Sequence, residues 1–176
     1  MTLTGQVYRA HHPRWSFAPV SGDGAAQHGG RFNPPGMPAL YTSLRMETAW
    51  REAQQAFPFK AQPMTVCMYD VDCSKVADLT APATCSDLGI DAAALGCGWE
   101  DIVDRGQIPP TWTIARRLVG SGFRAIIVPS FAANAPDTDR NVVFWAWSPG
   151  PPCSVNVVDD AQRLPRNDLS WDDPRD

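Results

Sequence analysis

The chain has 176 residues and a formal net charge of −4, with a sequence pI near 5.3. Hydrophobic residues make up 44% of it, which is enough to bury a core, so one folded domain is expected. An acidic chain lacks the basic face that sequence-independent binding of nucleic acid requires, and we expect no direct nucleic-acid partner. Only Lys60 and Lys75 are lysines among the 15 basic residues. That bias fits arginine-mediated phosphate binding or a GC-rich genome.

The cysteines and the N-terminus predict a reduced, cytoplasmic protein. Five cysteines without a C-x-x-C pair argue against both a disulfide framework and a zinc site. The N-terminal residues lack the apolar core of a signal peptide. No stretch approaches the roughly 20 apolar residues that a membrane helix needs.

The first third of the chain is expected to contain two short strands separated by a loop. Residues 6–10 and 39–42 read as strands. Residues 13–30 are rich in Pro, Gly, Ser and Asp, which is typical of a loop. A loop of this length in a compact domain is often functional. Its sequence fits either a lid or a target-recognition element.

A helix is expected over residues 44–57, capped by Ser43 and closed by Pro58. Apolar residues recur along it at helical spacing and predict the face that packs on the core. Glu52 falls on the flank of that face, at the boundary between core and solvent. The stripe consists of Met46, Ala49, Trp50, Ala53 and Phe57.

The rest of the chain is expected to add four strands and two helices. The strands are 64–71, 123–128, 141–147 and 154–158, and the helices are 99–105 and 111–119. Strands and helices do not alternate regularly, so an α+β fold is preferred to a doubly wound sheet. We expect a single domain over residues 1–162 and a charged C-terminal tail over 163–176.

Three residues that lie close together in the sequence suggest a ligand cleft. Arg31 follows two glycines, Tyr41 lies in a short apolar run, and Glu52 lies on the expected helix. A cation, an aromatic face and a carboxylate suit a charged, planar, sugar-containing ligand such as NAD. Each residue also has an ordinary interpretation: a surface arginine, a core tyrosine, and a glutamate that is solvated or paired with Arg45 or Arg51.

Two polar residues mark strand ends farther along the chain. Ser130 follows an apolar strand, where ligand-binding residues are frequent, although a turn serine is the ordinary interpretation. No G-x-S-x-G context surrounds it, so a nucleophile elbow is not supported. Asn141 opens the next strand as a turn residue or a loop-anchoring amide. The three histidines are too scattered for a metal triad, and the Walker and G-x-G-x-x-G phosphate loops are absent.

The run GGRFNPPGMPALYTS, followed by a helix that carries a glutamate, resembles the RES domain, the toxin half of RES–Xre toxin–antitoxin pairs. That family is named for an arginine, a glutamate and a serine. These match Arg31 in GGRFN, Glu52 in AWREA and Ser130 in IIVPS. Asn141 in NVVFWAW and Arg9 in VYRA also match the family.

The resemblance covers residues 7–158 and implies an ADP-ribosyltransferase-like α+β fold of mixed sheets with flanking helices. It implies a bacterial toxin that uses NAD as a substrate without a metal. It also implies an Xre-type antitoxin that blocks the cleft in a toxin–antitoxin hetero-oligomer.

The implied roles follow the chemistry of nicotinamide loss, which leaves positive charge on the ribose. Glu52 stabilises that charge, and Tyr41 orients and shields the nicotinamide. Arg31 and Arg9 bind the pyrophosphate or a ribose hydroxyl, while Ser130 and Asn141 donate hydrogen bonds to the ligand. Better-known ADP-ribosyltransferases carry their glutamate late in the chain, near a strand, whereas Glu52 is early and on a helix.

Three activities stay open. The first is transfer of ADP-ribose to a target protein, and the second is glycohydrolysis or phosphorolysis that depletes NAD without a protein acceptor. The third is a non-catalytic nucleotide-binding module. A nuclease toxin is disfavoured by the acidic charge and by the lack of a metal-binding motif. The sequence identifies neither the acceptor nor the stoichiometry of an antitoxin complex.

Overall fold

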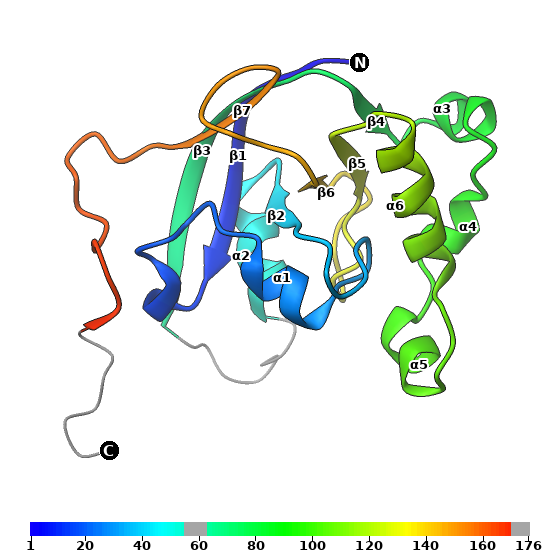
Figure 1. The fold of residues 1–176 in the computed structure, drawn as a ribbon, viewed down its shortest axis with the longest axis horizontal. Helices are drawn as coiled ribbons and strands as arrows, with labels where there is room; N and C mark the ends of the chain where they lie inside the picture. The colour runs from blue at the N-terminus through cyan, green and yellow to red at the C-terminus, as the bar shows by residue number, and fades with distance from the viewer. Residues whose placement is uncertain (55–62, 170–176) are drawn as a thin grey trace.

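The computed structural model describes residues 1–54 and 63–169, and in these the chain forms a seven-stranded sheet with helices around it (Figure 1). The strands are β1 Leu3–His11, β2 Leu40–Ser43, β3 Thr65–Cys73, β4 Val76–Asp78, β5 Ala125–Pro129, β6 Arg140–Phe144 and β7 Cys153–Val157. The helices are the 3-10 helix η1 Pro13–Trp15, then α1 Asp23–His28, α2 Met46–Gln54, α3 Pro82–Asp87, α4 Ala92–Leu95, α5 Trp99–Asp104 and α6 Pro110–Gly120. The predicted α+β class is confirmed, as is a strand or helix at each expected position after residue 63.

The sheet is mixed and is nearly divided in two between β1 and β2. Its order is β4-β5-β6-β2-β1-β3-β7, with β4 and β5 parallel and every other neighbouring pair antiparallel. β1 pairs with β3 along its whole length, but it meets β2 only where Tyr8 lies opposite Ser43. Beyond that single pair the two halves of the sheet separate, which leaves room for a cleft.

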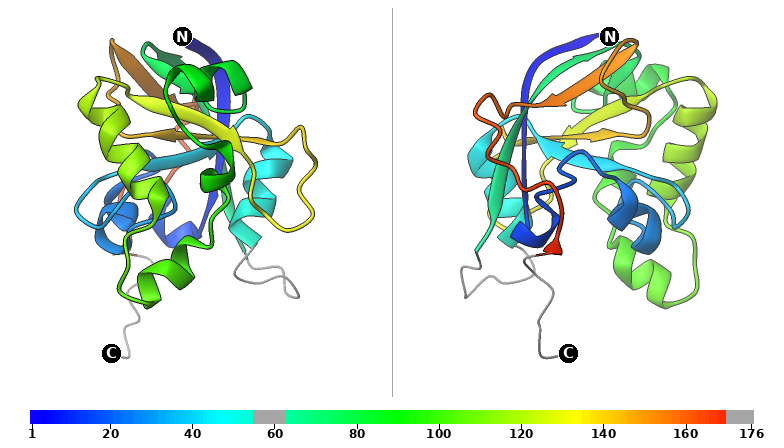
Figure 2. Two further views of the ribbon diagram at one scale, coloured as in Figure 1. Left: turned by 90° about the vertical axis from the view of Figure 1, so that its right-hand side faces the viewer. Right: turned by 60° about the vertical axis from the view of Figure 1, so that its left-hand side comes forward.

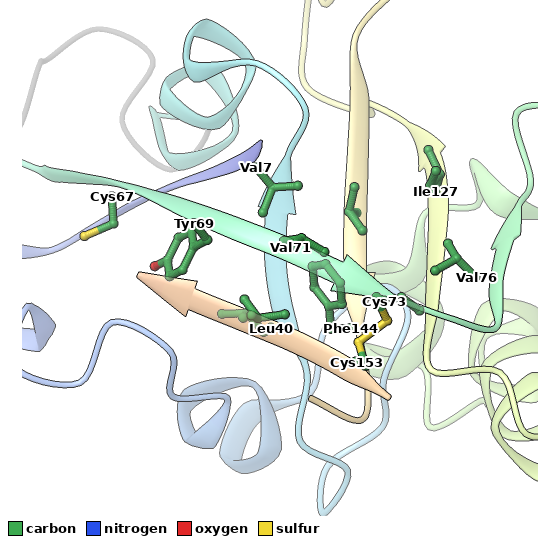
Figure 3. Packing of buried hydrophobic residues seen from close by; sticks show 13 residues of the cluster. Val7, Leu40, Cys67, Tyr69, Val71, Cys73, Val76, Ile127, Phe144 and Cys153 are labelled. Carbon is green, nitrogen blue, oxygen red and sulfur yellow. A yellow bond between two sulfur atoms is a disulfide. The ribbon is translucent and has the colours of Figure 1, made fainter. Parts of the chain in front are cut away.

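Buried side chains lie on both faces of the sheet because successive residues of a strand point to opposite sides. In β5, Ala125 and Ile127 belong to one hydrophobic cluster, and Ile126 and Val128 belong to the other. Figure 3 shows the first cluster, which gathers residues from all seven strands. The second cluster packs under the group formed by α3 to α6, which lies on one side of the molecule (Figures 1 and 2).

A disulfide joins Cys73 of β3 to Cys153 of β7 (Figure 3). The expectation of a protein without disulfides is therefore wrong. The two residues are 80 positions apart, and only the pairing of β3 with β7 places them opposite each other. Their spacing in the sequence carries no signal of that pairing.

Two local expectations in the first third of the chain need correction. Residues 13–30 contain η1 and α1 rather than only loop. Ser43 is the last residue of β2, and its hydroxyl donates to the side chain of Asn141 instead of capping a helix. The predicted end of the helix, at Phe57 and Pro58, lies outside the described residues.

The face of α2 that packs inward agrees only in part with the predicted stripe. Ala49 is buried as predicted, but Met46 and Trp50 are 52% and 40% exposed, and Thr48, which is not in the stripe, is buried. Small residues allow the helix to lie close to β1 and β2. This orientation turns Glu52 inward, toward the ends of the strands.

The predicted domain boundary at residue 162 stays a prediction. Leu164, in the predicted tail, packs against the first hydrophobic cluster. Within the described ranges, no helix has the length and apolar character to cross a membrane.

Candidate active site

Two adjoining hollows lie where α2 faces β2, β6 and the end of β5. The larger, of about 550 Å³, is the Arg31 lobe, and the smaller, of about 250 Å³, is the Arg9 lobe. Tyr41, Glu52, Ala53 and Asn141 line both lobes and so form the wall between them. The Arg31 lobe is completed by Arg31, Phe32, Trp99, Glu100, Val128, Phe131 and Val143, and the Arg9 lobe by Tyr8, Arg9, Ala10, Thr42, Ser43 and Ala49.

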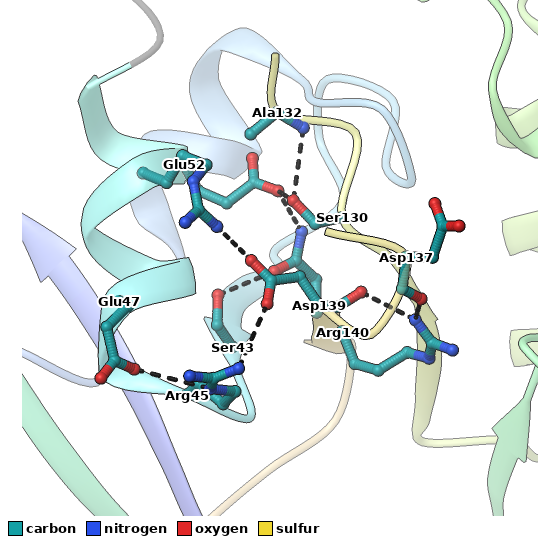
Figure 4. A network of polar contacts seen from close by, with 11 residues as sticks. Ser43, Arg45, Glu47, Glu52, Ser130, Ala132, Asp137, Asp139 and Arg140 are labelled. Atoms are coloured by element: carbon teal, nitrogen blue, oxygen red, sulfur yellow. Dashed lines mark hydrogen bonds and ion pairs between the residues drawn. The ribbon is translucent and has the colours of Figure 1, made fainter. Parts of the chain in front are cut away.

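Glu52 is held by two neutral hydrogen-bond donors at this shared wall (Figure 4). Its Oε1 accepts a hydrogen bond from the Ser130 hydroxyl at 2.5 Å and another from Asn141 Nδ2 at 2.5 Å. The Ser43 hydroxyl donates to Asn141 Oδ1 at 2.7 Å, which fixes the amide so that its nitrogen faces the carboxylate. The sequence-predicted Glu52, Ser130 and Asn141 therefore lie together.

Sheet pairing brings these distant residues into contact. Asn141 is opposite Ser43 in the β2–β6 ladder and opposite Val128 in the β5–β6 ladder. Ser130 follows directly after β5, and its hydroxyl accepts the N–H of Ala132 at 3.3 Å. Two adjacent strand ends thus present their polar side chains to the helix that carries Glu52.

A second carboxylate, Asp139, anchors the chain next to this cluster (Figure 4). Its side chain is 2% exposed and forms an ion pair with Arg51 of α2. Oδ1 of the same carboxylate lies 3.9 Å from Nη1 of Arg45. Its carbonyl oxygen accepts the N–H of Ser130 at 3.0 Å. Asp139 therefore ties the loop that carries Ser130 to the helix that carries Glu52. Sequence reasoning missed Asp139, and considered Arg45 and Arg51 only as possible partners of Glu52 in its ordinary interpretation.

Arg31 lines the larger lobe with its guanidinium group above an aromatic ring. The guanidinium carbon lies 4.5 Å from the centroid of the Phe131 ring, and Nη1 donates to the carbonyl of Cys97. Burial lowers the pKa of Arg31, but a guanidinium stays protonated at neutral pH. The lobe therefore has a fixed positive charge beside a flat apolar surface.

Gly30 lies against side chains that leave no room for a Cβ. A Cβ at this position would lie 2.6 Å from the Tyr41 hydroxyl and 2.8 Å from Asn33 Oδ1. The glycine therefore makes room for a side-chain network. In that network the Tyr41 hydroxyl donates to Asn33 at 2.7 Å and accepts from the Phe32 N–H at 3.0 Å.

Tyr41 is anchored by its hydroxyl while it lines both lobes. Burial raises the pKa of the phenol, which keeps it neutral. A stacking role toward a ligand stays a prediction, since the ring is also part of the second hydrophobic cluster.

Arg9 lines the smaller lobe from β1, on the other side of the division in the sheet. Its Nη1 donates to the carbonyls of Pro19 at 3.1 Å and Ser21 at 2.9 Å, and the Tyr69 hydroxyl also donates to Pro19. Burial lowers the pKa of Arg9, which stays a cation. Arg9 thus fastens the segment between η1 and α1 as well as facing the cleft.

Comparison with known proteins identifies the family. The sequence matches the RES domain over residues 6–172, which is most of the chain. This chain belongs to the RES domain family. No curated protein sequence matches it.

The fold of this RES domain is similar to that of a solved toxin. Comparison with a chain of the crystal structure of the M. tuberculosis MbcT–MbcA toxin–antitoxin complex gives a TM-score of 0.56 at 18% sequence identity. The match covers 90% of this chain and 84% of that one. The predicted ADP-ribosyltransferase-like fold class is confirmed by this likeness.

Sequence reasoning missed several residues of the cleft. Trp99 and Glu100 come from α5, and Phe131 lies below the guanidinium of Arg31. Phe131 could have been found as the neighbour of Ser130, but no pattern in the sequence points to Glu100. Across residues 1–54 and 63–169, no group of three or more His, Cys, Asp or Glu side chains is arranged to hold a metal.

Proposed function

We propose that this RES domain is the toxin of a toxin–antitoxin pair and that it cleaves the bond between nicotinamide and ribose in NAD. The observation that carries the proposal is the Glu52 carboxylate, held by Ser130 and Asn141 in the wall between two lobes. Each lobe has an arginine, a charge suited to a pyrophosphate or a ribose hydroxyl.

The reaction uses these groups as follows. The C–N bond breaks with its electron pair going to the nicotinamide nitrogen, so neutral nicotinamide leaves and positive charge develops on the ribose. Glu52 stabilises that charge because its carboxylate is fixed in place before the reaction. An acceptor then bonds to the anomeric carbon and gives up a proton. Tyr41 lines the space in which we place the nicotinamide, where it shields the leaving group from water.

We further propose that the acceptor is a side chain of a target protein. Water or phosphate as acceptor would instead make the enzyme an NAD glycohydrolase or phosphorylase. A protein antitoxin is proposed as the partner, supported by the toxin–antitoxin complex of the structural neighbour. That this antitoxin is of the Xre type, and that the toxin is cytoplasmic, stay predictions from the sequence.

Nicotinamide release tests the proposal. Purified protein is incubated with NAD, alone and with cell lysate, and nicotinamide is separated by chromatography, with Glu52→Ala as the control. Release that disappears in the control supports the proposal. Its absence in both mixtures would contradict NAD cleavage and leave a nucleotide-binding module. With NAD labelled in the adenylate, radioactivity on a protein band supports transfer, while free ADP-ribose alone would replace transfer with hydrolysis.

A further inference from the structure

A third hollow lies outside the cleft described above, between η1 and α1. Its volume is about 370 Å³, and we call it the aromatic slot. It falls in the segment whose sequence left open a lid or a target-recognition element. The lining residues are Arg9, His11, Trp15, Phe17, Ala18, Ser21, Asp23, Gly24, Gln27 and His28.

The slot combines aromatic and polar side chains. Trp15 and Phe17 have ring centroids 6.4 Å apart, and Trp15 is 54% exposed. The guanidinium carbon of Arg14 lies 5.6 Å from the centroid of the Trp15 ring, and an indole is also a surface on which a flat heterocycle stacks. Asp23 and Gln27 line the slot from α1. A flat ring with hydrogen-bonding groups on its edge suits this combination.

The slot adjoins the proposed NAD site through one residue. Arg9 lines both the Arg9 lobe and the aromatic slot, and it lies just beyond the single pair at which β1 meets β2. Arg9 is therefore part of the wall that the cleft and the slot share. A dinucleotide with its nicotinamide ribose at Glu52 must place its adenosine away from that carboxylate, and the slot is available on the side of Arg9.

Gln27 matches the edge of adenine in particular. A glutamine amide can accept from the exocyclic N6 amino group and donate to N7 at the same time. Hypoxanthine carries an oxygen in place of the amino group and so offers two acceptors, which one amide cannot pair in this way. The other face of the slot, at Trp15, does not distinguish bases because every base has a π face.

We propose that the aromatic slot binds the adenine ring of NAD, stacked on Trp15 and recognised by Gln27. The inference rests on the proposed NAD cleavage and assigns the second half of the substrate. It predicts that the slot contributes to binding of NAD but not to the reaction at the nicotinamide ribose.

The test compares NAD with nicotinamide mononucleotide, which has the scissile bond but no adenine. Trp15→Ala is expected to raise KM for NAD about tenfold or more, the range of one base–aromatic stack, with kcat nearly unchanged. Its effect on nicotinamide mononucleotide, measured as substrate and as competitive inhibitor of NAD cleavage, is expected to be nil. Trp15→Phe keeps a ring and should recover most of the affinity. Trp50→Ala removes an exposed indole that lines neither the cleft nor the slot. It should change neither KM for NAD nor the behaviour of nicotinamide mononucleotide.

A second variant tests the recognition of adenine. The wild-type protein should cleave NAD with a lower KM than the hypoxanthine analogue, and Gln27→Ala should abolish that preference. Equal effects of Trp15→Ala on both nicotinamide compounds, or no effect on either, would overturn the slot assignment while NAD cleavage still stood. Failure of the wild-type protein to release nicotinamide from NAD would count against the proposed function itself.

Discussion

Two carboxylates lie side by side between α2 and the β5–β6 connection, and their surroundings differ. Asp139 is 2% exposed and is matched by the guanidinium groups of Arg51 and Arg45. Glu52 accepts hydrogen bonds from the neutral side chains of Ser130 and Asn141 and lines both lobes. A buried acid matched by arginines is a structural anchor, because its charge is already compensated. Glu52 interacts electrostatically with Arg31, but it lies at the cleft wall, from which we propose that its carboxylate acts on the developing cation.

Replacing Glu52 is expected to have the largest effect. It should lower the rate of nicotinamide release and leave the stability of the protein unchanged. Glu52→Gln keeps the size of the side chain but removes the charge, so nicotinamide release should fall about 100- to 1000-fold while the melting temperature barely moves. Glu47→Gln is the matched control, because Glu47 lies on the same helix with a side chain 62% exposed. Loss of activity in both variants would show that Glu52 has no special role compared with Glu47.

Replacing Asp139 should instead affect stability first. Asp139→Asn leaves Arg51 without its buried partner, and the free energy of unfolding should fall by about 2–3 kcal/mol. This is below the value for a fully buried pair, since the Arg51 side chain is 33% exposed. Urea denaturation measures it, with Asp137→Asn, an exposed acid in the same loop, as control. An unchanged unfolding free energy would show that Asp139 is not an anchor.

Replacing the side chains that hold Glu52 should lower kcat less as their distance from Glu52 along the hydrogen-bond chain increases. Ser130→Ala removes a direct donor and should lower kcat about tenfold, which corresponds to one hydrogen bond to a charged group. Ser43→Ala acts on Glu52 through the amide of Asn141 and not directly, so it should have the smaller effect on kcat. The reverse order in nicotinamide-release assays would contradict the geometry of this cluster.

The outermost ion pair should have the smallest effect. Arg45 pairs with Glu47 at 3.6 Å, and their side chains are 55% and 62% exposed. Exposed pairs contribute about 0–1 kcal/mol, so Glu47→Ala should leave both the urea midpoint and the rate within error. A clear loss of stability would mean that the network around Asp139 extends farther than its buried part.

The sequence predicted the members of the cluster better than it predicted the reasons for their positions. The family resemblance picked out Glu52, Ser130 and Asn141, which the sheet brings together. The apolar stripe on α2 placed Ala49 and Trp50 inside. Ala49 is buried, but Trp50 is exposed and Thr48, which is not in the stripe, is buried. Helical periodicity ranks residues by hydrophobicity, but here small side chains and polar partners on β6 decide which face packs inward.

Long-range pairing explains most of what could not be predicted. The ion pair between Arg51 and Asp139 and the disulfide between Cys73 and Cys153 join segments 80 or more residues apart in the chain. Each depends on the order of strands in the sheet, which local patterns do not encode. The helix α1 was hidden for another reason, since its six residues in a Gly-rich segment give no periodic signal.

The most direct test of the account measures binding and cleavage of NAD on the same preparation of Glu52→Gln. If Glu52 acts on the charge that develops during bond breaking, the dissociation constant for NAD should stay within a few-fold of wild type while nicotinamide release falls about 100-fold or more. Cleavage at the wild-type rate would contradict the account, because the carboxylate would then have no part in the reaction.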